Sequence, residues 1–267
     1  MPVAHVNGVD IYFEVAGTGP RLLALPGSGA DLRAANIGRP LEDRFTVLTL
    51  DQRGLGRSGV PAGPYTMADY AEDALALLDH VGWERAHVLG VSFGGMVAQE
   101  IAIRAPQRVD RLVLACSSSG GAGGASAPLH EYADLPLDEQ TAVRMEVLDR
   151  RHDAAWRVSH PDEVAALHER LARAASRDDE AKRGGRLQLL ARAGHDTYDR
   201  LLQIAAPTLV AGGRFDGQAP PANQAAIHAR IEGSELEFFE GGHGFTREDP
   251  RAYEAFASFL LAEGEAP

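Results

Sequence analysis

The stretch "HVLGVSFGGMVAQE", residues 87–100, joins a predicted strand to a predicted helix through a turn that contains Ser92. The strand covers residues 86–92, a nearly continuous apolar run of the kind that is buried on both faces. The helix covers residues 93–105 and ends where Pro106 follows. A strand, a tight turn with a serine at its centre and a helix therefore succeed one another without an intervening loop.

The turn itself has the pattern G-x-S-x-G, which runs from Gly90 to Gly94. After a strand and before a helix, this pattern indicates a nucleophile elbow, in which a strained turn holds the serine hydroxyl outward. Small residues are expected at both ends because strand and helix approach closely there. The start of the helix presents free N–H groups and the positive end of its dipole. We therefore predict Ser92 as a nucleophile and the Phe93 N–H as one donor of an oxyanion hole.

Outward from this turn, predicted strands and helices alternate in both directions along the chain. Residues 4–17 are typical of a hairpin that turns at Asn7-Gly8. Further strands are predicted over residues 21–27, 45–51, 111–117, 206–213 and 236–241. Further helices are predicted over residues 66–81 with Thr66 as the cap, 220–231 and 251–264. This alternation predicts an α/β fold with a mostly parallel sheet that helices cover on both faces.

The pattern is interrupted between two of the strands. Residues 118–126 form a Gly/Ser tract, and residues 127–203 hold helical runs without a convincing strand. We therefore expect a core domain made of residues 1–126 and 204–267, with residues 127–203 inserted as an α-helical cap. Either an apolar inner wall of this cap or its ordinary packing accounts for Trp156, Leu167, Leu171 and Leu190.

A serine hydroxyl is a weak nucleophile and needs a base, which an acid in turn orients. Of the ten histidines, His243 lies in the glycine-flanked loop "EGGHGF" after the last predicted strand, where it is free to reach the elbow. Asp216 follows the strand at residues 206–213 and is the predicted acid. Asp196 and Asp199 are its competitors, but they precede that strand instead of following it.

The second oxyanion donor is expected on the loop after an earlier strand. The sequence "ALPGSGAD", residues 24–31, supplies such a loop directly after an apolar run. We predict that the backbone N–H of Ser28 pairs with that of Phe93 to hold an oxyanion.

Another glycine-rich stretch, "GLGRSG" at residues 54–59, matches the letters of a dinucleotide-binding fingerprint. That site requires a helix to begin at once, with its N-terminus aimed at the phosphates. Here "VPAGPY" follows, and the next predicted helix starts only at Thr66. We therefore expect no nucleotide cofactor, and the single cysteine and scattered histidines indicate no metal site.

Composition narrows the choice of partners. The chain has 267 residues and a formal net charge of −12, which disfavours nucleic acid and anionic membranes as partners. No apolar window approaches a membrane span, and the N-terminal residues do not have the pattern of a signal peptide. A cytoplasmic protein acting on a small molecule is expected, and the oligomeric state is left open.

Taken together, these motifs resemble the α/β-hydrolase superfamily along nearly the whole chain. The matching segments are "LPGSGA", "DQRGLGRS", "GVSFGG", "GGRFDG" and "GGHGF". The resemblance implies an eight-stranded, mostly parallel sheet with a helical cap after strand six. It also implies a catalytic triad of Ser92, Asp216 and His243, with Asp51 and Arg53 linking loops near the site. The oxyanion loop departs from the frequent His-Gly form, since it reads Pro26-Gly27.

The expected activity is that of a serine hydrolase on a small or medium carboxylic ester or lactone, through an acyl-enzyme. A serine at the elbow argues against the aspartate-nucleophile branches, the haloalkane dehalogenases and epoxide hydrolases. The same triad also suits C–C bond hydrolysis, perhydrolysis or a biosynthetic cyclisation, and proteins of this fold include non-catalytic binding proteins. The sequence leaves these alternatives open.

Overall fold

The computed structural model describes residues 2–33 and 36–262, and an eight-stranded sheet lies at its centre. The strand order is β1-β2-β4-β3-β5-β6-β7-β8. β2 pairs antiparallel with β1 and β4, and all other neighbours are parallel. The bounds are β1 (Val3–Val6), β2 (Val9–Ala16), β3 (Arg21–Leu25), β4 (Thr46–Leu50), β5 (Ala86–Val91), β6 (Val109–Ala115), β7 (Thr208–Gly213) and β8 (Glu235–Phe239). The predicted mostly parallel sheet is confirmed.

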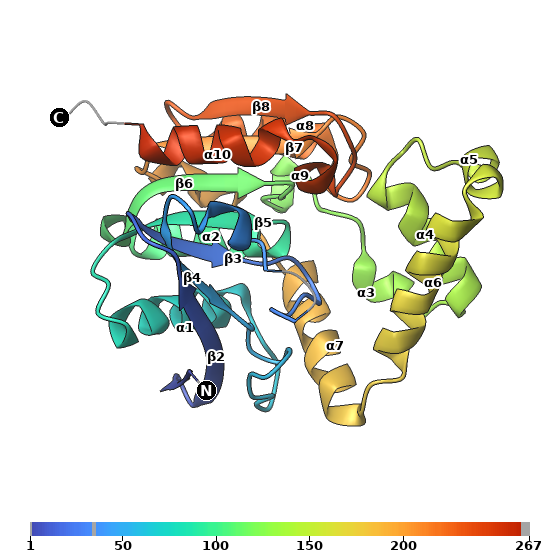
Figure 1. Cartoon of the computed structure of the whole chain (residues 1–267), viewed down its shortest axis with the longest axis horizontal. Coiled ribbons are helices and arrows are strands. Elements are labelled where there is room, and N and C mark those ends of the chain that lie inside the picture. Colours follow the sequence, from blue (N-terminus) through green and yellow to red (C-terminus); the bar gives the residue numbers. More distant parts are fainter. Residues whose placement is uncertain (1, 34–35, 263–267) are drawn as a thin grey trace.

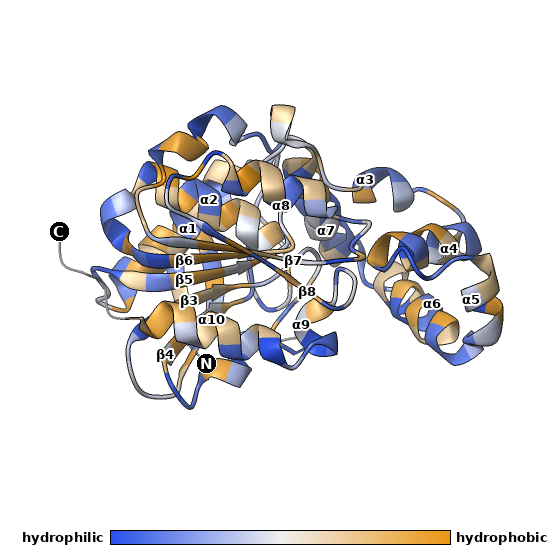
Figure 2. Cartoon of the chain, turned by 90° about the horizontal axis from the view of Figure 1, so that it is seen from above, coloured by the Kyte–Doolittle hydropathy of each residue, from blue (hydrophilic) through white to orange (hydrophobic). Residues whose placement is uncertain are grey.

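Helices cover both faces of this sheet because side chains alternate between the faces along each strand. In β3, Leu23 and Leu25 pack into one apolar core, whereas Leu22 and Ala24 pack into the other. The first core includes α1 (Met67–His80), α2 (Phe93–Arg104) and α8 (Pro221–His228). The second includes η1 (Arg39–Leu41), α9 (Phe245–Glu248) and α10 (Arg251–Leu261), on the opposite side of the strands (Figure 2).

Local signals at the ends of elements agree with the structure in several places. The hairpin turns at Asn7 and Gly8, which both have positive φ. Thr66 caps α1, and its side chain and that of Asp69 form a reciprocal capping box. The ends of some elements differ by a few residues from the predicted ends. β6 begins at Val109, earlier than predicted, and α8 ends at His228, before the predicted end, in a tightened last turn.

The insertion after β6 is helical, as predicted. Among the described residues, no strand occurs between β6 and β7. Figure 1 shows α4, α5 and α6 set beyond the carboxyl ends of the strands, with α7 between them and the sheet. The bounds of its helices are η3 (Gly121–Gly123), α3 (Leu129–Tyr132), α4 (Leu137–Leu148), α5 (Ala154–Ser159), α6 (Pro161–Ala175), α7 (Asp179–Ala193) and η4 (Tyr198–Gln203), whereas η2 (Pro106–Arg108) lies just before β6.

The four apolar residues considered for an inner wall line neither of two cavities in the described part of the chain, one beside α2 and one beside α4. Trp156 is stacked between His152 and His160 on the outer helix α5. Leu167 is buried in α6, and Leu190 is 46% exposed. These positions favour ordinary packing and surface over a pocket wall. None of the helices described is both long and apolar enough to cross a bilayer.

Candidate active site

Ser92 lies on a strained turn between β5 and α2. Its backbone has φ 56° and ψ −114°, a conformation that non-glycine residues rarely adopt. A Cβ atom on Gly94 would lie 1.9 Å from the Leu25 carbonyl oxygen, and one on Gly90 would lie 2.4 Å from the Gly94 carbonyl oxygen. Close packing of helix on strand therefore requires glycine at both positions, and it leaves the serine at the carboxyl edge of the sheet.

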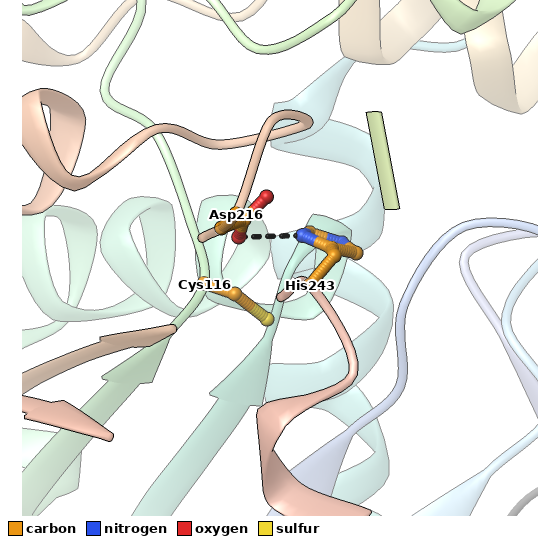
Figure 3. Close-up of side chains that lie close together, drawn as sticks. All are labelled: Cys116, Asp216 and His243. Carbon is orange, nitrogen blue, oxygen red and sulfur yellow. Dashed lines mark hydrogen bonds and ion pairs between the residues drawn. The ribbon is translucent and has the colours of Figure 1, made fainter. Parts of the chain in front are cut away.

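The three predicted polar side chains meet at this edge. The Oγ atom of Ser92 lies 2.9 Å from Nε2 of His243, and Nδ1 of the same ring lies 2.8 Å from Oδ2 of Asp216. Asp216 is fully buried, and the His243 side chain is 11% exposed. Figure 3 shows the carboxylate and the imidazole approaching each other from two different loops. The arrangement orients the imidazole so that it can accept the serine proton.

The loop after β7 holds Asp216 through its other oxygen. Oδ1 accepts hydrogen bonds from the N–H groups of Gln218 and Ala219, both at 2.8 Å. The two competing aspartates have other roles in the structure. Asp196 accepts a hydrogen bond from the Tyr198 N–H, and Asp199 forms an ion pair with Arg230.

The histidine loop is attached to the C-terminal end of α4. The His243 N–H donates to the Leu148 carbonyl at 2.6 Å, and the Gly217 N–H donates to the Val147 carbonyl at 3.1 Å. The last carbonyl groups of α4 therefore hold the backbone of the histidine loop and of the acid loop. An inserted helix thus positions both catalytic loops, which the sequence did not predict.

The two predicted oxyanion donors lie on either side of Ser92. Phe93 is the first residue of α2, and Ser28 lies in a turn closed by the Ala30 N–H and the Gly27 carbonyl. A Cβ atom on Gly27 would lie 3.4 Å from the Ser92 Cβ, so this loop contacts the nucleophile directly. Among the hydrogen bonds of the described residues, neither N–H has an acceptor.

Two glutamines also reach the site, and neither is predicted by the sequence. Nε2 of Gln218 lies 2.6 Å from Nε2 of His243, so its amide reaches the nitrogen that also contacts Ser92. From α7, Oε1 of Gln188 accepts a hydrogen bond from the Gly29 N–H at 2.7 Å and so holds the oxyanion loop. The only sequence signal for Gln218 is its place two residues after the acid, and Gln188 carries none.

Cys116 lies behind the triad, at the end of β6. It is 1% exposed, and burial, together with the nearby Asp216, raises the pKa of its thiol. Its sulfur, a carboxylate oxygen of Asp216 and a nitrogen of His243 lie within 4.8 Å of one another (Figure 3). The last two groups already share a hydrogen bond, so the pairing of Asp216 with His243 accounts for this cluster.

The "GLGRSG" loop has no helix directly after it, since α1 begins only at Met67. As predicted, its neighbours link loops. Asp51 accepts hydrogen bonds from the backbone N–H groups of Leu32 and Arg57, and Arg53 forms a buried ion pair with Asp73 at 2.6 Å. The backbone N–H groups of Gly54, Leu55, Ser58 and Gly59 donate to carbonyls of the chain itself.

Comparisons with known proteins agree with this architecture. A family model described as alpha/beta hydrolase fold matches residues 20–250. A provisionally named carbamate hydrolase, RutD, of Azorhizobium caulinodans is 29% identical over 272 residues, covering 95% of this chain and 95% of that protein. The 3-oxoadipate enol-lactonase 2 of Acinetobacter baylyi is 29% identical over 216 residues, covering 79% of this chain and 77% of its own.

A solved structure shows the same fold. The enol-lactonase from Burkholderia xenovorans LB400 has a TM-score of 0.81, covering 98% of this chain and 100% of that one. The two sequences are 24% identical, so this likeness concerns the fold alone.

Proposed function

Because the chain belongs to the α/β-hydrolase fold family, we propose that it is a serine hydrolase that cleaves a small or medium carboxylic ester or lactone. Residues 127–203 would cap the site of a core domain formed by residues 1–126 and 204–267. The observation that carries the proposal is the unbroken hydrogen-bonded chain from Ser92 through His243 to Asp216, at 2.9 and 2.8 Å.

In the first half of the reaction, Oγ of Ser92 attacks the substrate carbonyl carbon while its proton passes to Nε2 of His243. The carbonyl oxygen becomes an oxyanion, which the N–H groups of Ser28 and Phe93 hold. Asp216 keeps Nδ1 protonated and stabilises the imidazolium. When the tetrahedral intermediate collapses, the imidazolium returns its proton to the leaving alkoxide, and an acyl-enzyme and an alcohol result.

In the second half, water attacks the acyl carbon and gives a proton to the same imidazole nitrogen. The second intermediate collapses with release of the carboxylic acid, and His243 returns the proton to Oγ of Ser92. Gln218 reaches the imidazole nitrogen that both half-reactions use, so its amide lies where the leaving group and then the water pass. The relative named 3-oxoadipate enol-lactonase 2 supports the lactone part of the proposal.

The test combines labelling with a substrate panel. A fluorophosphonate probe should label the wild type at Ser92 and leave the Ser92→Ala variant unlabelled. On p-nitrophenyl esters and simple lactones, Ser92→Ala should lower kcat/KM by ~10⁴-fold or more, with an unchanged melting temperature.

A folded wild type that neither labels nor turns over any substrate would indicate a non-catalytic binding protein instead. Labelling of Ser92 combined with turnover of carbamates or C–C bond substrates alone would keep the nucleophile and overturn the ester and lactone assignment.

A further inference from the structure

Arg192, on α7, is a buried cation whose hydrogen-bonding capacity is largely unused. The residue is only 4% exposed. Its Nη1 donates to the Ala127 carbonyl at 2.7 Å, and that segment is attached to the acid loop because the Ala127 N–H donates to the Gln218 carbonyl. Its Nε and Nη2 atoms are buried and have no hydrogen-bond partner among the residues that the structure describes. A buried donor without an acceptor is costly, so the site calls for an acceptor that the protein does not supply.

The two unused atoms form one edge of the guanidinium. Two other arginines of this chain use the same edge to donate hydrogen bonds to a carboxylate. Arg53 uses Nε and Nη2 on the two carboxylate oxygens of Asp73, at 2.6 Å each. Arg151 uses the same two atoms on Asp149, at 2.9 and 2.6 Å. Such a fork matches the spacing of two carboxylate oxygens. Arg192 therefore presents an open bidentate site.

Arg192 lies near a second buried arginine, Arg144. Among the described residues, no Asp or Glu forms an ion pair with Arg192 or with Arg144, whose Nε is also buried without a partner. Burial, followed by repulsion from Arg144, lowers the pKa of Arg192 to about 10. Burial likewise lowers the pKa of Arg144 to about 10, with Arg170 adding to the effect. Both remain cationic at neutral pH, and the Asp216 carboxylate, which favours the charged form of Arg192, already pairs with His243.

Arg192 is one of the residues that line a cavity beside α2. The cavity measures ≈ 110 Å³, and its lining includes Arg192 and Met96, which lies one turn along α2 from Ser92. His195 also lines it, and burial lowers the pKa of that imidazole to about 4, so it is neutral at pH 7. One turn before Arg192 on α7, Gln188 contacts the oxyanion loop. Gln188 and Arg192 lie one turn apart on the same face of α7, so this face extends from the oxyanion loop to the cavity.

We propose that Arg192 binds a carboxylate on the substrate, so that the hydrolysed ester or lactone is an anionic one. This inference rests on the proposed hydrolase function and adds the chemical class of the substrate. The carboxylate lies in the cavity beside α2 while the scissile carbonyl lies at Ser92, so the preferred substrates carry the two groups a few bonds apart.

A matched pair of substrates tests the inference. The p-nitrophenyl monoester of glutaric acid carries a free carboxylate, and the p-nitrophenyl ester of monomethyl glutarate has the same chain with that charge removed. The wild type should prefer the carboxylated ester in kcat/KM by roughly 10- to 100-fold, as expected for charge-assisted bidentate hydrogen bonds. Arg192→Met should abolish this preference, and Arg192→Lys should retain part of it.

Arg186→Met is the matched control, because Arg186 lies on the same helix in an exposed ion pair with Asp134. It should leave the ratio between the two esters unchanged. An equal preference for both esters in the wild type, or an unchanged ratio in Arg192→Met and Arg192→Lys, would overturn the inference while leaving the hydrolase proposal intact.

A binding measurement separates this question from catalysis. Glutarate should bind to Ser92→Ala in a calorimetric titration, and the additional change Arg192→Met should weaken that binding by about 10-fold or more. If the double variant bound glutarate as tightly as Ser92→Ala does, Arg192 would not be the carboxylate site. This result does not depend on knowing a substrate of the enzyme. Absence of fluorophosphonate labelling combined with Arg192-dependent glutarate binding would instead sink the hydrolase proposal and keep the carboxylate site.

Discussion

At the scale of single residues, the two oxygens of Asp216 have separate tasks. Oδ1 accepts two backbone N–H groups and fixes the loop, whereas Oδ2 faces Nδ1 of His243. Substitution by the amide should keep the first task, because an amide oxygen still accepts. It should reverse the second, because an amide NH₂ facing Nδ1 favours the imidazole tautomer that carries its proton on Nε2. That tautomer cannot accept the proton of Ser92.

We therefore predict that Asp216→Asn folds normally and loses about 10⁴-fold in kcat. Steady-state turnover of a p-nitrophenyl ester measures the loss in kcat, and a circular-dichroism melt measures whether the variant folds normally. Asp199→Asn is the control, because that carboxylate pairs with Arg230 on the surface and should not affect turnover. Near-normal activity of Asp216→Asn would show that another acid orients the histidine.

At the scale of elements, α7 connects the insertion to the active site through residues spaced four apart. Gly184, Gln188 and Arg192 lie on one face of the helix. A Cβ atom on Gly184 would lie 2.0 Å from the Gly54 carbonyl oxygen, so the helix backbone rests directly on the "GLGRSG" loop. This contact accounts for Gly54 of that loop, whose added Cβ would in turn lie 3.2 Å from the Gly184 Cα. It also determines how closely Gln188 approaches the oxyanion loop.

Two adjacent glycines of α7 make this testable. Gly184→Ala should destabilise the protein by ~1–3 kcal/mol, because backbone atoms must move apart, and it should lower kcat/KM by displacing Gln188. Gly185 has open space around it, so Gly185→Ala should stabilise the helix by about 0.5–1 kcal/mol. Urea unfolding of both variants measures the difference. Two variants of equal stability would show that α7 does not rest on Gly54.

At the scale of the whole molecule, buried titratable groups couple stability to pH. Burial lowers the pKa of His195 to about 4, and the same cause lowers the pKa of His87. The unfolded chain, with ordinary histidines, therefore binds more protons than the folded chain between pH 4 and about 6.5. Stability rises with pH across this window and is lost as the pH falls through it.

We predict that His195 alone accounts for about 3 kcal/mol of the loss between pH 6.5 and pH 4. His195→Gln should remove this contribution, so its free energy of unfolding should fall less steeply with acid than that of the wild type. Urea unfolding at intervals from pH 7.5 to pH 4 measures both slopes. Parallel curves for the two proteins would contradict the buried, neutral state of His195.

The sequence by itself determined the alternation of strands and helices, the elbow at Ser92 and the loops that carry Asp216 and His243. These features depend on neighbours in the chain: apolar periodicity, caps such as Thr66, and glycines at the ends of strands. The resemblance to a known family then joined loops that are 151 residues apart, from Ser92 to His243. Element ends were less predictable because packing decides the last turn.

Only the tertiary structure decided which polar groups of the insertion reach the site. Gln188 contacts Gly29 across 159 residues, the end of α4 holds the histidine loop, and Arg192 is left with an open edge. In sequence these residues look like any polar residue of an exposed helix. Their burial and their missing partners follow from how α4 and α7 dock on the core, and that docking depends on contacts between segments that local periodicity does not describe.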